Sequence, residues 1–177
     1  AYLARPCQFV DLTRETNCRK DYWTGQRYSD EVVSSMNTAV SKLMARSGAV
    51  KLHLVGYSGG GAIAVLLASR RADVSSIRTV AGNLDPVSLF KTKNVTPLYG
   101  SLDPTKVASK LKNVPQIHFS GSDDVIVPPW VASDWVKLSQ NSQCVRHTLV
   151  LNTSHSSGWE KNWSRLLLGK PICFGLN

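Results

Sequence analysis

A chain of 177 residues, 42% of them apolar, can bury the core of one globular domain, so we expect a single domain over residues 1–177. The formal net charge of +9 raises nucleic acid and anionic membranes as partners, but the Lys and Arg residues are scattered and no run interleaves them with aromatics. A solvated basic face is favoured over a specific nucleic-acid surface, while contact with an anionic membrane surface stays open. No apolar run approaches the length of a membrane-spanning helix.

The chain contains four cysteines, Cys7, Cys18, Cys144 and Cys173. They form no C-x-x-C pair, which argues against a zinc ribbon or a thioredoxin-type redox site, and we expect no metal and no cofactor. An even count allows two disulfides, which would indicate an oxidising compartment. Buried free thiols are the alternative.

The first third of the chain is expected to hold a strand, a loop and a helix. Residues 1–4 resemble the middle of a strand, a start that suggests a processed or truncated product, and residues 14–28 are polar without a sustained period. Ser29 then supplies a cap, two acids follow it, and apolar residues recur at helical spacing until Gly48 ends the helix.

Apolar strand and helix patterns alternate through the rest of the chain. We expect strands at residues 51–55, 77–81, 116–119 and 145–151, and helices at residues 62–68, 130–138 and 159–168. This alternation predicts a parallel sheet with helices on both faces, in which ligands bind beyond the carboxyl ends of the strands.

The stretch VGYSGGGAI follows the strand at residues 51–55 and allows two phosphate-binding interpretations. A P-loop is excluded because no lysine follows the glycines. Gly59, Gly61 and Ala64 fit the dinucleotide pattern G-x-G-x-x-A, but Asp73 precedes the next strand and Asp85 follows it, so neither lies where a ribose-binding acid is needed.

The same stretch also matches G-x-S-x-G, with Ser58 at its centre, between a strand and a helix. In that setting the serine lies on a strained turn and acts as a nucleophile, and small neighbours are needed because the two backbones come close. The motif becomes specific when an acid and a histidine follow it in order.

Both residue types follow at the ends of later predicted strands. FSGSDDVIVPP places Asp123 and Asp124 just past one strand, and LNTSHSSGW places His155 just past the last. The other histidines, His53, His118 and His147, lie within predicted strands and are interpreted as packed or surface residues.

These motifs resemble the α/β-hydrolase superfamily and, in more detail, a bacterial group of exported, periplasmic or lipoprotein-type serine hydrolases. The likeness extends over nearly the whole chain, through ARPCQFV, YWTGQRYSDEV, VGYSGGGAIA, GSDDVIVP and H-x-x-x-W. It implies an α/β-hydrolase fold, a mostly parallel sheet with helices on both faces, and a periplasmic or secreted location that includes anchoring through a region upstream of residue 1. The superfamily pattern D-x-x-V-P selects Asp124 as the acid, and Asp123 would cap the loop.

The expected chemistry follows from these residue types. His155 would take the proton of Ser58, while Asp124 would fix the histidine tautomer and stabilise its charge. The backbone N–H of Gly59 would be one oxyanion donor, and Tyr57 is expected to bind substrate. We expect a serine hydrolase that cleaves carboxylic esters or lipids through an acyl-enzyme. The alternative is an inactive hydrolase-like module that binds a ligand or partner.

We further expect the disulfides Cys7–Cys18 and Cys144–Cys173. In a parallel sheet the last strand rises from Cys144 toward the active-site end, and the closing helix returns the chain to that start, bringing Cys173 beside it.

In the superfamily a second oxyanion donor comes from a loop after an earlier strand, and no such loop is present here. The resemblance implies that the missing strand lies between the strand at residues 1–4 and the strand at residues 51–55. We therefore expect an N-terminal segment of the same precursor, cleaved but still bound as a second chain, to complete the sheet. The alternative is a minimal hydrolase in which the remaining strands pair directly.

Overall fold

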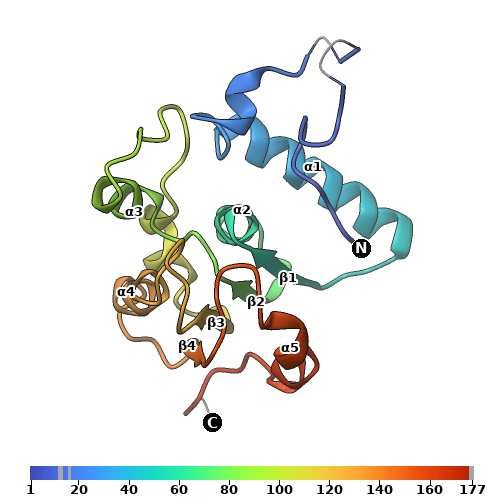
Figure 1. Cartoon of the computed structure of the whole chain (residues 1–177). Coiled ribbons are helices and arrows are strands. Elements are labelled where there is room, and N and C mark those ends of the chain that lie inside the picture. The colour runs from blue at the N-terminus through green and yellow to red at the C-terminus, as the bar shows by residue number, and fades with distance from the viewer. Residues whose placement is uncertain (12–13, 16, 176–177) are drawn as a thin grey trace. The chain divides into compact units, whose positions relative to one another are not determined.

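The computed structural model of the protein describes residues 1–11, 14–15 and 17–175. They form two compact units. The helical unit comprises Ala1–Val50 and Pro86–Asp103, and the sheet unit comprises Lys51–Asp85 and Pro104–Asn177. Figure 1 shows the elements of both units. Among the helices in the described residues, none combines the length and the hydropathy that crossing a membrane requires.

The sheet unit is built on four parallel strands in the order β1-β2-β3-β4. Their bounds are Leu52–Tyr57 for β1, Val74–Val80 for β2, Gln116–Gly121 for β3 and Val145–Val150 for β4. The four strands predicted at residues 51–55, 77–81, 116–119 and 145–151 are therefore confirmed, with ends shifted by a few residues. Because all strands run the same way, their carboxyl ends meet at one edge of the sheet.

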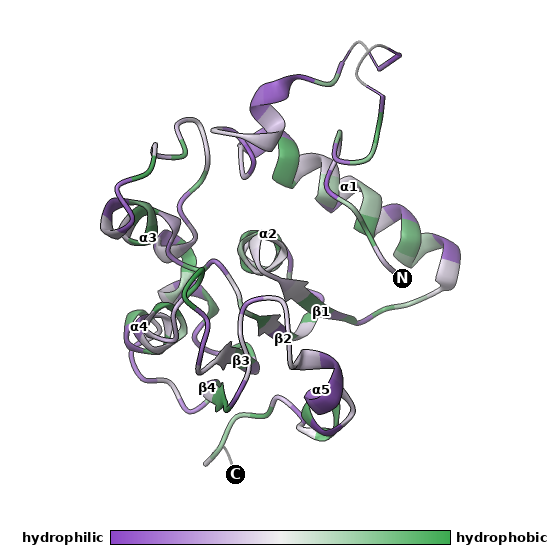
Figure 2. Cartoon of the chain, viewed as in Figure 1, coloured by the Kyte–Doolittle hydropathy of each residue, from purple (hydrophilic) through white to green (hydrophobic). Residues whose placement is uncertain are grey.

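Helices cover both faces of this sheet, as predicted (Figure 1). Helix α2, Gly59–Ala68, packs on β1 and β2, and α4, Trp130–Leu138, packs on β3 and β4. Helix α5, Trp159–Leu168, is amphipathic and carries both hydrophilic and hydrophobic residues in Figure 2. Two short 3₁₀ helices, η2 (Pro104–Val107) and η3 (Ser109–Leu111), precede β3.

Side chains of β3 alternate between the two helical layers. Ile117 and Phe119 form a buried apolar cluster with Trp159 and Leu166 of α5. His118 points to the opposite face, where its ring packs edge-on against Trp135 of α4. This alternation is the two-residue period of a strand buried on both faces.

The helical unit contains the 3₁₀ helix η1 (Lys20–Trp23), α1 (Asp30–Ser47) and α3 (Pro86–Thr92). The predicted ends of α1 are confirmed: the Ser29 hydroxyl accepts from the Val32 N–H at 3.4 Å, and Gly48 closes the helix with φ of 68°. Helix α3 was not predicted, because seven residues give too short a periodic pattern.

The strand expected at residues 1–4 is wrong. The chain there is irregular, and the side chain of Tyr2 is 87% exposed. A short apolar run becomes a strand only where a neighbouring strand pairs with its backbone, and residues 1–4 pair with no strand in the described part of the chain. The loop expected at residues 14–28 includes η1, and position 16 lies outside the described residues.

Both expected disulfides are present, which removes the free-thiol alternative. Cys7–Cys18 lies within the helical unit, and Cys144–Cys173 joins the start of β4 to the segment after α5. The second bond spans 29 residues, as the path of a parallel strand and its returning helix predicted. In the chain-entropy model a loop of this size contributes about 3–4 kcal/mol to stability.

Candidate active site

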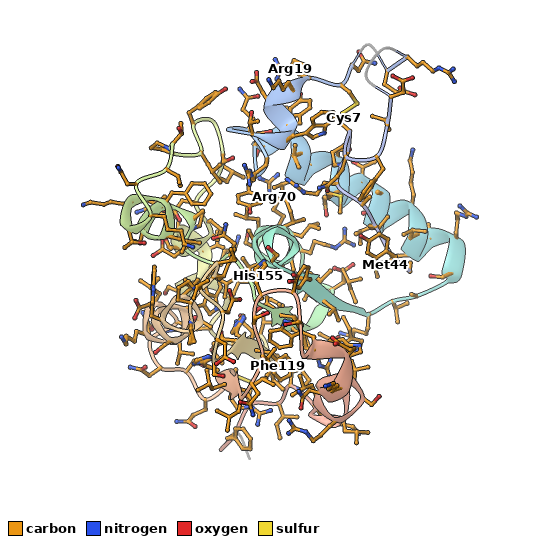
Figure 3. All side chains as sticks on the ribbon, in the orientation of Figure 1. Cys7, Arg19, Met44, Arg70, Phe119 and His155 are labelled. Atoms are coloured by element: carbon orange, nitrogen blue, oxygen red, sulfur yellow. A yellow bond between two sulfur atoms is a disulfide. The ribbon has the colours of Figure 1, made fainter. Side chains whose placement is uncertain are left out.

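Ser58, Asp124 and His155 meet at the carboxyl edge of the sheet. Ser58 follows β1, Asp124 follows β3 and His155 follows β4. His155 Nε2 lies 3.0 Å from Ser58 Oγ, and His155 Nδ1 lies 2.9 Å from Asp124 Oδ2. A carboxylate accepts only, so Nδ1 carries the proton and Nε2 accepts from the serine hydroxyl. Figure 3 labels His155 by the ribbon of α2.

The backbone at Ser58 forms a strained turn between β1 and α2. Its φ of 50° and ψ of −121° lie in a region that L-residues rarely adopt. Two backbone hydrogen bonds connect the turn to the end of β2 and the residues after it. The Ser58 N–H donates to the Val80 carbonyl at 2.9 Å, and the Ser58 carbonyl accepts from the Asn83 N–H at 3.0 Å. Gly56 must be small, since a Cβ there would collide with the Gly60 carbonyl.

Gly59 is the first residue of α2. Amides in the first turn of a helix have no intrahelical acceptor, and the helix dipole adds positive potential at this end. The Gly59 N–H therefore belongs to a group of amides suited to binding an anion beside Ser58.

The two neighbouring aspartates occupy different environments. The Asp124 side chain is fully buried, and its Oδ1 accepts from the N–H groups of Ile126 at 2.9 Å and Val127 at 2.8 Å, which leaves Oδ2 for His155. Asp123 is exposed and accepts from the Ser122 hydroxyl at 2.8 Å. The structure thus brings Asp124, rather than Asp123, to the histidine.

The loop carrying His155 is anchored through its backbone. The His155 carbonyl accepts from the Tyr57 hydroxyl at 2.9 Å and from Trp159 Nε1 at 3.0 Å, and the rings of Tyr57 and His155 lie 5.4 Å apart. Burial raises the pKa of Tyr57, and the negative charge of Asp124 raises it further. The Tyr57 hydroxyl therefore keeps its proton and remains a donor.

The remaining histidines make other contacts in the sheet. His53 Nδ1 lies 2.7 Å from Ser76 Oγ. His118 is fully buried, its Nδ1 lies 2.8 Å from Thr79 Oγ1 and its Nε2 lies 3.1 Å from Gln116 Oε1. Burial lowers the pKa of His118 to about 3, so this ring stays neutral inside the core. For His53 and His118, these contacts agree with the interpretation as packed or surface residues.

The sheet unit also contains an apolar pocket that sequence patterns did not reveal. It has a volume of about 400 Å³ and is lined by Val55, Tyr57, Val80, Ser156, Trp159 and Trp163. Two of these residues are adjacent in sequence to the site, because Tyr57 precedes Ser58 and Ser156 follows His155. In the part of the chain that the structure describes, His, Cys, Asp and Glu form no group of three that could hold a metal ion.

No family model and no curated protein matches this chain, but solved structures share its fold. An esterase of Pyrococcus furiosus aligns with a TM-score of 0.61 and 12% identity over 78% of this chain and 61% of its own. A monoacylglycerol lipase of Paleococcus ferrophilus aligns at 0.59 and 12% over 77% of this chain and 73% of its own. A puromycin-hydrolysing peptidase of Mycobacterium tuberculosis aligns at 0.57 and 17% over 71% of this chain. The present chain spans only 22% of that peptidase.

Proposed function

From the α/β-hydrolase fold of this chain, we propose that it is a serine hydrolase that cleaves carboxylic esters or lipids. The observation that carries the proposal is the continuous hydrogen-bonded line from Ser58 through His155 to Asp124, with the serine on a strained turn. The buried carboxylate of Asp124, the tautomer of His155 and the position of Ser58 Oγ each meet what a serine nucleophile activated by histidine requires. It favours an enzyme over a binding module that lost its chemistry.

The proposed reaction proceeds by acyl transfer. As Ser58 Oγ attacks the ester carbonyl, its proton moves to His155 Nε2, and Asp124 stabilises the imidazolium. The carbonyl oxygen becomes an oxyanion that the Gly59 N–H stabilises. His155 then protonates the departing alcohol, an acyl-enzyme remains on Ser58, and a water molecule deprotonated by His155 releases the acid.

We propose that the apolar pocket takes the acyl group of the substrate. Its walls are aliphatic and aromatic side chains, which bind an alkyl or aryl group through the hydrophobic effect and offer little to a charged one. The ring of Tyr57 would form one wall, which is the substrate-binding role expected from the sequence.

A larger side chain in this pocket should shorten the preferred acyl chain. Val55 is 53% exposed, so Val55→Trp can fill the pocket from the sheet face without overpacking the core. With p-nitrophenyl esters of increasing chain length, the wild type should hydrolyse esters with an apolar acyl chain and Ser58→Ala should not. In Val55→Trp, kcat/KM for the longest accepted chain should fall about tenfold, the size of one to two lost methylene contacts.

The matched control for Val55→Trp is Val50→Trp, because Val50 is 80% exposed and does not line the pocket. An identical chain-length profile in Val55→Trp and wild type would place the acyl group elsewhere. No hydrolysis of any ester by wild-type protein would count against the esterase itself.

We propose that the protein works in an oxidising compartment, either the periplasm or the extracellular medium. We also propose that it contacts anionic membrane surfaces there and that an upstream region of the precursor anchors it to the membrane. Two disulfides support the oxidising compartment, and the net charge of +9 supports contact with an anionic surface.

We also propose that an upstream segment of the same precursor binds as a second chain and pairs with β1. In the described residues β1 pairs with β2 on one side, and no described strand pairs with its other side. An unpaired strand edge leaves backbone donors and acceptors without a ladder. A loop on the added strand would provide the second oxyanion donor, whose absence typically costs about 10²–10³ in rate.

Non-reducing mass spectrometry of the protein isolated from its native source tests the location and the second chain together. The expected result is four oxidised cysteines and a copurifying upstream segment whose removal lowers esterase activity about 10²-fold. Four free thiols would contradict the location, and full activity from these 177 residues alone would contradict the second chain.

A further inference from the structure

The imidazole of His155 has to stay within hydrogen-bond distance of Ser58 and Asp124, which follow the strands β1 and β3. It lies between the end of β4 at Val150 and the start of α5 at Trp159, in a stretch without regular secondary structure. Backbone hydrogen bonds of helices or strands therefore do not fix its position. Turn hydrogen bonds such as Ser154 N–H to the Ser157 carbonyl, together with side-chain contacts to the loop, supply that order.

The His155 carbonyl oxygen accepts two hydrogen bonds from side chains, one from a residue later in the chain and one from a residue much earlier. Trp159 Nε1 donates to it at 3.0 Å and also donates to the Ser154 carbonyl at 2.9 Å, so this contact ties the loop to the helix that follows it. The Tyr57 hydroxyl donates at 2.9 Å from strand β1. The second contact spans 98 residues of sequence and starts from the residue directly before Ser58.

We propose that Tyr57 is a positioning residue whose hydroxyl fixes the distance between the histidine loop and the nucleophile. Because Tyr57 and Ser58 are consecutive, a shift of the loop away from the serine lengthens this hydrogen bond unless the Tyr57 side chain moves with the loop. The inference rests on the proposed function for its catalytic consequence, and the geometry assigns the hydroxyl and the ring separate tasks. The hydroxyl positions His155, while the ring forms a wall of the apolar pocket.

Phenylalanine at position 57 separates these two tasks, since it keeps the ring and removes the hydroxyl. With the carbonyl still bound by Trp159, the loop should become less ordered without unfolding. We expect Tyr57→Phe to lower kcat about tenfold and to leave KM within twofold, because small displacements of a catalytic group lower the rate of the chemical step while the binding wall persists.

The matched control is Tyr99→Phe. Tyr99 is 57% exposed against 48% for Tyr57, and its hydroxyl also donates a hydrogen bond, to Asp21 Oδ1 at 3.1 Å in the helical unit. Tyr99→Phe should leave kcat and KM at wild-type values. Equal losses of kcat in the two variants would mean that removing any surface hydroxyl has this effect, which would overturn the proposal.

A spectroscopic measurement separates this inference from the proposed function. The Nδ1 proton of His155, hydrogen-bonded to Asp124, should give a downfield proton resonance, which His155→Ala identifies by its loss. In Tyr57→Phe the resonance should broaden through faster exchange with water, whether or not the wild type hydrolyses esters. An unchanged resonance together with kcat within twofold of wild type would overturn the positioning role, whereas absent wild-type turnover would count against the hydrolase alone.

Discussion

Replacing Ser58 by alanine is expected to lower kcat for ester hydrolysis by about 10⁴- to 10⁶-fold, because no nucleophile remains to form the acyl-enzyme. The residual rate would come from substrate binding and the oxyanion donor. Stability should hold, since alanine is smaller than serine at a site where the Ser58 backbone carries the structural hydrogen bonds to Val80 and Asn83. Thermal unfolding measured beside the kinetics checks this.

His155→Ala should cause a loss of the same size, and the double variant should be little worse than either single variant. Ser58 and His155 act as one unit, because the hydroxyl is a poor nucleophile until the imidazole takes its proton. A double variant about a thousandfold slower than both singles would mean that the two residues act independently, which would contradict the pair.

Asp124→Asn is expected to lower kcat by about 10⁴-fold. If the amide oxygen keeps the two backbone hydrogen bonds to residues 126 and 127, the amide presents an N–H group to His155 in place of a carboxylate oxygen. The imidazole would then favour the wrong tautomer, and the imidazolium formed during attack would lose its counter-charge.

Asp123→Asn provides the matched control, because it makes the same chemical change one residue away. Asp123 is exposed, and its contacts to Ser122 and Thr153 belong to the loop rather than to the histidine. Its kcat should stay within a few-fold of wild type. The reverse ranking of the two variants would assign the acid to Asp123.

Local signals in the sequence were strong wherever one physical rule decided the structure. Ser29 followed by two acids and later by Gly48 bounded α1, because cap and dipole effects act on the nearest residues alone. The proximity of Ser58, Asp124 and His155 could also be predicted, because each follows a predicted strand and parallel strands end at the same edge of the sheet.

Features that depend on distant partners could not be read in this way. Residues 1–4 have the composition of a strand but no pairing partner among the described residues, and the pocket combines β1, β2 and α5. The hydrogen bond from Tyr57 to the His155 carbonyl joins positions 98 residues apart, and no periodicity reports such a contact. Cys144–Cys173 was the exception, because the topology itself specifies where the returning chain passes.

The most direct test of the central claim is labelling with a fluorophosphonate, followed by mass spectrometry of the modified peptide. The reagent phosphonylates a serine hydroxyl whose proton a neighbouring histidine can accept, so it requires the geometry between Ser58 Oγ and His155 Nε2. The account predicts one phosphonate per chain, on Ser58, with parallel loss of ester hydrolysis and no labelling of His155→Ala. Folded wild-type protein with both disulfides intact that takes up no label, or is labelled at another serine, would contradict it.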